Sequence, residues 1–275
     1  ETYVDQSDPE DWTLNNGELR ARMDLAYDEM GRVCQRTTYR VASGTLSETD
    51  ELIADTWYDD EGRIIKHSDA NGMFRKTQYD SVGRVLASYL CYDSDGDDTA
   101  GGSAYADAGN VTGDVVIEQT EYQYDAHGNA WLTCAWRRNH DTTGTGDLSW
   151  ASAPKGQAAY TVEWYDDIGR VTHRALYGHN DKTDITGVSS DFDPSGSTQT
   201  YSQYADDVAP DCSDKILVTK TEYPVSNQTY PGTPHQMLAV TDNAGKVTYT
   251  ESDDLGRTTR TIENYVDGTA GNTDY

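Results

Sequence analysis

The feature that most constrains this chain is a phrase that returns along its length, Tyr-Asp-x-x-Gly, followed in most copies by Arg. Between residues 58 and 90 the phrase occurs twice with a looser copy between, and the three glycines lie ten and then eleven residues apart. A repeat this short holds one strand of about six residues and one turn. The copies consist of Tyr27, Asp28, Gly31 and Arg32; Tyr58, Asp59, Gly62 and Arg63; Tyr79, Asp80, Gly83 and Arg84; Tyr124, Asp125 and Gly128; Tyr165, Asp166, Gly169 and Arg170; and Asp253, Gly256 and Arg257. Looser copies are Asp69-Ala-Asn-Gly72, Asp193-Pro-Ser-Gly196 and Asp242-Asn-Ala-Gly245.

The physical chemistry of the phrase predicts a hairpin turn. An Asp at the first turn position can accept a hydrogen bond from the backbone two residues on. The Gly at the fourth position tolerates the positive φ that closes a type I turn with a bulge. The flanking residues are rich in Thr, Val and Tyr with a period near two, as in 161–165 and 170–176, which is typical of strands. We therefore expect an all-β fold, an elongated or spiralling antiparallel sheet of repeated hairpins, with successive turns on opposite edges.

The repeat runs through most of the chain, which predicts a single array over residues 1–275. Loops of more than about 15 residues are uncommon unless they have a function or are held by neighbours. Helix signals are nearly absent, and only residues 50–55 carry a faint one. Both ends read like the interior of a protein, so we expect a segment of a longer chain. Inserts without the close phrase interrupt the array at about 92–113, 139–156, 179–214 and 224–234.

Charge and composition exclude several kinds of partner. The chain has 48 acidic and 21 basic residues, a formal net charge of −27. Phosphate backbones and anionic lipid repel such a chain, so we expect no nucleic-acid partner. No apolar run reaches the roughly 18–20 residues that cross a bilayer, so we expect no membrane insertion. With 20 Tyr and 6 Trp, the core is expected to consist of Tyr, Trp, Val and Thr rather than Leu and Phe.

The quoted motifs resemble the YD repeat, also called the rearrangement-hotspot (RHS) repeat, from about Tyr27 to Tyr265. The resemblance implies a long β-ribbon that spirals, either as a shell around a toxic C-terminal segment or as an adhesion or scaffold module of a large surface protein. It also implies neighbouring YD repeats of the same or identical chains as partners. The family's self-cleaving region is built around Asp-Pro-x-Gly-Leu. Here Ser197 follows Gly196, so we interpret that copy as an ordinary turn.

Candidate chemical sites are few. Acidic residues are so abundant that no pair stands out as a general acid and base, and we expect no enzyme and no required cofactor. Asp93, Asp95 and Asp97 alternate as in an acidic Ca²⁺ loop, against the alternative of a solvated loop. Asn110 and Asn227 fit the N-glycosylation pattern. Cysteines that could form one or two disulfides, or remain buried thiols, are Cys34, Cys91, Cys134 and Cys212.

These features predict a non-enzymatic structural module of a secreted or cell-surface protein, a stiff β scaffold that forms the repeating unit of a filament. One alternative is a wall segment of a toxin-encapsulating shell. Another is a glycan-binding adhesin, in which tryptophans such as Trp57, Trp131 and Trp164 stack on sugar rings rather than forming the core.

Overall fold

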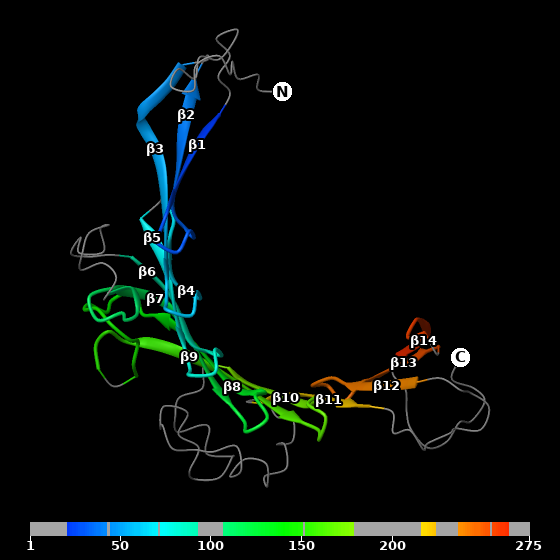
Figure 1. The fold of residues 1–275 in the computed structure, drawn as a ribbon. Helices are drawn as coiled ribbons and strands as arrows, with labels where there is room; N and C mark the ends of the chain where they lie inside the picture. The colour runs from blue at the N-terminus through cyan, green and yellow to red at the C-terminus, as the bar shows by residue number, and fades with distance from the viewer. Residues whose placement is uncertain are drawn as a thin grey trace, which may run out of the picture. The chain divides into compact units, whose positions relative to one another are not determined.

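The computed structural model describes residues 21–42, 45–70, 72–92, 107–150, 152–178, 216–223, 236–253 and 255–263. Within these ranges fourteen strands follow one another in chain order, and each strand lies beside the next in one sheet (Figure 1). The pairing is antiparallel, as in the first and last hairpins. The predicted all-β antiparallel sheet is thus confirmed, whereas the elongated or spiralling shape stays a prediction. The chain divides into two compact units, which are described separately.

Unit 1 comprises residues 1–119 and 138–156. Its buried side chains alternate along β5 and β6, where Phe74, Lys76, Ala87, Tyr89 and Cys91 share one face of the sheet. This alternation is what a strand with one buried face requires. The strands are β1 (Arg22–Tyr27), β2 (Val33–Ala42), β3 (Thr45–Tyr58), β4 (Ile64–Ser68), β5 (Met73–Tyr79), β6 (Val85–Tyr92) and the first half of β7 (Val115–Tyr124).

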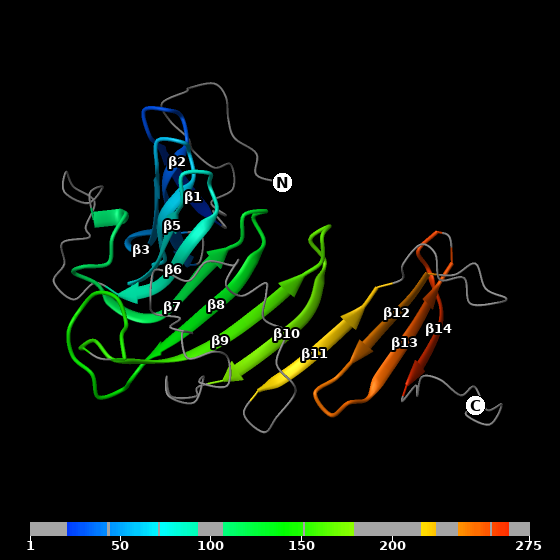
Figure 2. The same ribbon diagram turned by 90° about the horizontal axis from the view of Figure 1, so that it is seen from below.

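Unit 2 comprises residues 120–137 and 157–275. Its core is aromatic, since Trp131, Trp136, Tyr160, Trp164 and Tyr177 are all buried. Figure 2 shows its strands side by side. They are the second half of β7, β8 (Ala130–Arg138), β9 (Gly156–Tyr165), β10 (Val171–Gly178), β11 (Leu217–Glu222), β12 (Gln236–Thr241), β13 (Val247–Ser252) and β14 (Thr258–Glu263).

The sequence predicts a core of Tyr, Trp, Val and Thr rather than Leu and Phe. This is correct for Tyr, Trp and Val and wrong for Thr, Leu and Phe. Phe74, Leu132 and Leu148 are buried. Thr37 is the one buried threonine among the residues whose side chains the structure describes. A strand that is half buried can turn its threonines to the other face, so β-propensity alone does not place them in the core. Residues 50–55, with their faint helical signal, lie in β3, where pairing with β2 overrides a weak local preference.

The turns fall on alternate edges of the sheet. In unit 1 the turns after β1, β3 and β5 carry close copies of the phrase and lie on one edge, because antiparallel strands reverse direction at each turn. The looser copy after β4, at 69–72, lies on the opposite edge. In unit 2 the close copies after β7 and β9 share one edge, and the looser copy after β12 lies on the other. In both units, therefore, the close copies form a row along one edge.

Candidate functional site

All the described copies of the phrase form the same turn. The backbone N–H of Gly31 donates to the carbonyl of Asp28 at 3.0 Å, and the N–H of Asp28 donates to the carbonyl of Arg32 at 2.9 Å. Gly31 has a φ of 78°, in the left-handed region that favours glycine. This is the geometry expected of a type I turn closed by a glycine bulge. The same pair of backbone bonds recurs in the turns that begin at Asp59, Asp69, Asp80, Asp125, Asp166, Asp242 and Asp253.

In the close copies the Asp carboxylate holds the turn together. In the first copy, Oδ1 of Asp28 accepts the N–H of Met30 at 3.0 Å and the N–H of Arg32 at 2.8 Å. Its Oδ2 accepts Nε of the Arg32 guanidinium at 2.6 Å. The Arg after the Gly therefore pairs first with the Asp of its own copy. In the fourth copy Asn129 replaces Arg, and its Nδ2 donates to Oδ2 of Asp125 at 2.8 Å.

These bonds lower the pKa of several motif carboxyls. The backbone N–H of Arg32, followed by its guanidinium, holds the pKa of Asp28 below its ordinary value, and the pKa of Asp166 is lowered in the same way by the Arg that follows it. At Asp59 and Asp80 burial acts to raise the pKa, but the hydrogen bonds and charge of the following Arg more than offset it, so the pKa is lowered there too. The ionised form is thus the one that the turn stabilises.

In unit 1 the first three close copies also bind one another along the edge. Nη1 of Arg32 donates to the carbonyl of Asp59 at 3.2 Å, and its guanidinium lies over the ring of Tyr58, 4.5 Å from the centroid. The Tyr58 hydroxyl donates to the carbonyl of Val33 at 2.9 Å. The third copy repeats all three contacts with the second: Arg63 to the carbonyl of Asp80, Arg63 over Tyr79, and the Tyr79 hydroxyl to the carbonyl of Ile64. We call this set of contacts the turn ladder.

The turn ladder continues within unit 2 in modified form. The Tyr165 hydroxyl donates to the carbonyl of Ala130 at 2.8 Å, the residue after Asn129. Arg170 then lies over the ring of Tyr223, 4.1 Å from the centroid. Tyr223 thus occupies the place of the motif tyrosine, although Pro224 stands where the Asp would be. Sequence reasoning missed this degenerate copy; a Tyr at the end of a strand was the only signal for it.

A buried lysine fixes an insert of unit 1 to the sheet. Lys76 is 2% exposed, and its Nζ donates to the carbonyls of Asp107 and Asn110 at 2.8 and 2.9 Å. The Asp114 carboxylate lies 2.8 Å away and is also buried. Lys66 is buried as well, with Nζ 4.3 Å from the ring centroid of Phe74. The two ammonium groups lie on the inner face of the sheet, which no motif indicated.

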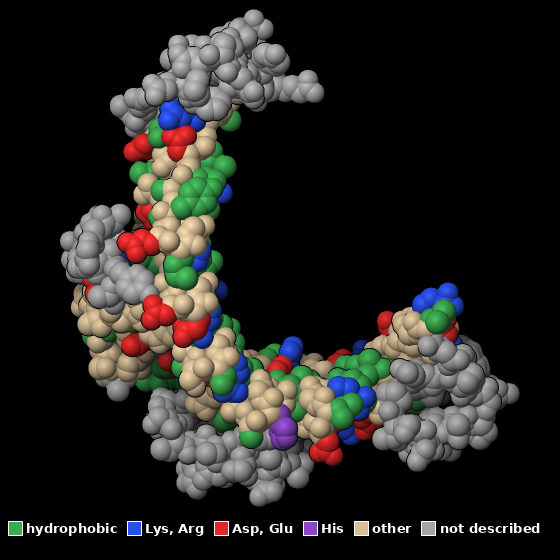
Figure 3. Space-filling model, viewed as in Figure 1, with side chains coloured by type: hydrophobic (Ala, Val, Ile, Leu, Met, Phe, Trp, Pro, Cys, Tyr) green, Lys and Arg blue, Asp and Glu red, His purple; other side chains and the backbone are tan. Residues whose placement is uncertain are grey.

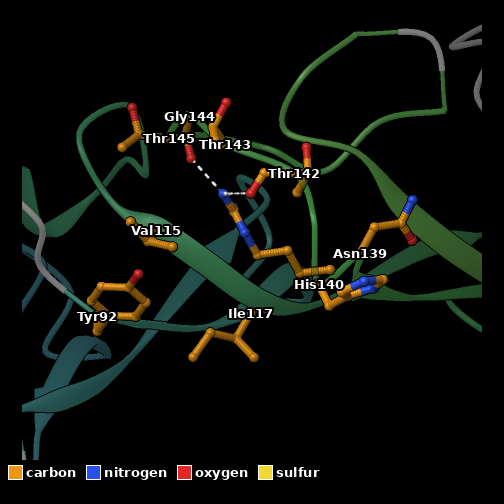
Figure 4. A pocket seen from close by; sticks show the side chains of 10 residues that line it. Tyr92, Val115, Ile117, Asn139, His140, Thr142, Thr143, Gly144 and Thr145 are labelled. Carbon is orange, nitrogen blue, oxygen red and sulfur yellow. Dashed lines mark hydrogen bonds between the residues drawn. The ribbon is translucent and has the colours of Figure 1, made fainter.

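Unit 1 also contains a pocket of about 570 Å³ beside β7 (Figure 4). Arg138 shapes its wall, because Nη2 donates to the carbonyls of Thr142 and Gly144 at 3.3 and 2.7 Å. Tyr92 and Ile117 supply its apolar part. The described residues that line the pocket include a histidine but no carboxylate. The lining residues are Tyr92, Val115, Ile117, Arg138, Asn139, His140, Thr142, Thr143, Gly144 and Thr145.

The structure describes only some of the residues of the other predicted sites. Asp93, Asp95, Asp97 and Asn227 lie outside the described residues, as do the inserts at 179–214 and 224–234 and the turn at 193–196. Within the described ranges no three metal-ligating side chains come together, and the calcium site stays a prediction.

Asn110 lies in the described part of an insert, where its Oδ1 accepts the N–H of Thr112 at 3.0 Å. Its glycosylation stays a prediction. Cys34, Cys91 and Cys134 are not joined to one another by a disulfide, and burial raises the pKa of the Cys134 thiol. In the part of the chain that the structure covers, no helix is long and apolar enough to pass through a membrane.

Comparison with known proteins finds similarity to solved structures of toxin complexes. No family model matches the chain, and no curated protein does. The crystal structure of TcdB2–TccC3–Cdc42 is 12% identical with a TM-score of 0.31, and the match covers 88% of this chain and 12% of that one. The Photorhabdus luminescens Tc holotoxin pore with a mutated TccC3 gives the same values. TcdB2–TccC3 without its hypervariable C-terminal region is 11% identical with a TM-score of 0.30 and the same coverage. This chain thus spans about an eighth of the length of those chains.

Proposed function

We propose that this chain is a non-enzymatic structural module of a larger extracellular or cell-surface YD-repeat protein, in which it supplies a stiff stretch of β-sheet. The single observation that supports this proposal is the turn ladder. In unit 1 the arginines of the first two copies and the tyrosines of the second and third copies are engaged by a neighbouring copy, and the Asp carboxylates by their own turn. Side chains committed in this way are not free for a substrate.

Stiffness follows from the kind of contact in the ladder. A hairpin alone is marginally stable in water. Here the first three close copies are tied to one another by one hydrogen bond from Arg, one from Tyr and a stacked guanidinium, as between Arg63 and Tyr79. Each hydrogen bond contributes about 0.5–1.5 kcal/mol and an exposed cation–π contact about 0.5–1 kcal/mol. Bending the sheet at its edge would have to break several of these contacts together.

Limited trypsin digestion tests the proposal, because trypsin cleaves after the motif arginines. In the folded chain we expect cleavage after Arg32, Arg63 and Arg84 to be at least tenfold slower than in the urea-unfolded chain, since a protease needs the turn to open. Asp59→Ala should restore cleavage after Arg63 and leave Arg84 protected. Asp60→Ala, a change at an exposed turn position, is the matched control. Equal cleavage rates in folded and unfolded chains would refute the proposal of a stiff module.

Negative-stain electron microscopy of the native material distinguishes the forms that such a module can take. Filaments are the expected result. Closed capsules would indicate a wall segment of a shell instead of a filament unit. Isolated particles that bind to a sugar array would indicate a glycan-binding adhesin instead of a filament unit.

A further inference from the structure

The most exposed apolar side chains of the described residues share one position in the repeat. Met30, Val82, Ile168 and Leu255 are 72, 73, 74 and 78% exposed, whereas the next large hydrophobic, Leu52, is 59% exposed. Each of the four is the residue immediately before the glycine of a close copy. We call this position the tip residue. Turn positions favour Gly, Asn, Asp and Ser, so local turn chemistry does not explain apolar tips.

The tips are held rigidly. The backbone N–H of each apolar tip donates to Oδ1 of the motif Asp: Met30 to Asp28 and Val82 to Asp80, both at 3.0 Å. The equivalent bonds exist at Ile168 and Leu255. A side chain on a rigid turn loses little backbone freedom when a partner covers it, which favours binding. On the face drawn in Figure 3, apolar side chains lie among charged and polar ones.

In unit 1 the turn ladder places three tips in one row. Arg32 joins the first turn to the second and Arg63 joins the second to the third. Consecutive turns on one edge are two strands apart, about 9.5 Å, so the first and third tips are about 19 Å apart. The row reads Met30, Glu61, Val82, which is apolar, acidic, apolar.

The negative charge of the turns in this row indicates what kind of partner can bind there. The motif arginines are paired with the motif aspartates, so their charges cancel. The other acids on the turns are Glu29, Asp60 and Glu61, all exposed, and Glu61 also pairs with Nη2 of Arg63 at 3.1 Å. Six acids against three arginines leave these three turns with a net charge of −3. A second copy of the chain would bring like charges together, and anionic lipid would be repelled. A partner with basic side chains beside apolar ones complements both features.

We propose that the turn edge of unit 1, defined by Met30, Glu61 and Val82, is a docking strip for a basic amphipathic helix of another protein. A helix rises 1.5 Å per residue, so about 14 residues reach from the first tip to the third. Its apolar face would cover Met30 and Val82, and its Lys or Arg side chains would lie beside the acids of the turns. This interaction is additional to the scaffold function and does not depend on it.

The test uses the full chain and a fluorescent Leu/Lys peptide of about 18 residues, long enough to span the strip as an amphipathic helix. We expect saturable binding that weakens roughly tenfold in the double variant Met30→Ser, Val82→Ser, since both apolar anchors are lost. The matched control is Met23→Ser, Leu52→Ser, which removes two exposed apolar side chains away from the turns. Both variants keep the net charge of −27, so non-specific attraction of the basic peptide is the same in each.

Circular dichroism should show the same strand content in both variants and thus exclude loss of folding. Equal affinities for the peptide in the tip variant and the control would overturn the proposal. Equal affinity for a Leu/Glu peptide of the same pattern would also overturn it, because the acids of the turns would then not select a basic partner. A third contrary result would be that the parent chain and the control float with neutral phosphatidylcholine vesicles and the tip variant does not, because the tips would then bind lipid.

Discussion

Replacing Lys76 by Met tests how firmly the insert of unit 1 is fixed to its sheet. The Lys76 ammonium is buried and has three oxygens within 2.9 Å, two carbonyls and the Asp114 carboxylate. Methionine keeps the length of the side chain but removes its charge and its donors. Removing one partner of a buried ion pair costs about 3–5 kcal/mol, because the remaining charge is left in a medium of low dielectric. Lys76→Met should therefore destabilise the segment from 107 to 119 by about that amount.

Amide hydrogen exchange of the peptide covering 107–119, read by mass spectrometry, measures this change locally. If opening of the segment limits exchange, a loss of about 3–5 kcal/mol speeds exchange by roughly 10² to 10⁴-fold. Lys155→Met removes an exposed ammonium from the same unit and should change stability by less than about 0.5 kcal/mol. Adding Asp114→Leu to Lys76→Met should recover part of the loss, since neither charge of that ion pair then remains buried. A Lys76→Met chain that exchanges as slowly as the Lys155→Met chain would refute the reasoning.

Three further predictions concern the motif itself. Tyr79→Phe keeps the ring over the guanidinium but loses the hydroxyl bond to the preceding copy, and should lower the free energy of unfolding in urea by about 0.5–1.5 kcal/mol; no change would remove that bond from the ladder. Gly83→Val and Gly169→Val should each cost more than about 1 kcal/mol, because φ is 91° and 81° there; melting temperatures equal to the parent's would contradict this. The backbone N–H and then the guanidinium of Arg170 lower the pKa of Asp166 below its ordinary value of 3.8. Its contribution is therefore present above about pH 4 and is lost as the pH falls through the folded pKa, so melting curves from pH 7 to pH 2 should fall less steeply for Asp166→Asn than for the parent chain.

The turns could be predicted from sequence because their chemistry is local. Asp at the first position and Gly at the fourth act within five residues, so the hairpin at Asp80 to Arg84 follows from its own side chains. Alternate placement of successive turns on two edges followed from the spacing. The prediction missed the second role of the motif, in which Tyr and Arg bind a neighbouring copy.

The residues that bind each other in this second role are not separated by a fixed number of residues along the chain. The hydroxyl of Tyr79 reaches a carbonyl 15 residues back, that of Tyr58 reaches 25 back and that of Tyr165 reaches 35 back. No periodic pattern joins such pairs, because inserts and long strands of different length stand between the copies. The partner of each Tyr is defined only when the sheet has brought every second turn to the same edge.

By itself the sequence determined the β class, the place of the turns at the described copies of the phrase and the residues that form them, because strand alternation and turn chemistry depend on neighbours a few residues apart. Tertiary structure alone decided which copies bind each other, which insert Lys76 holds, and that Met30 and Val82 point into solvent on one edge. Those outcomes depend on which strands become neighbours and on what the buried face must enclose, and both arise from contacts between residues distant in the chain.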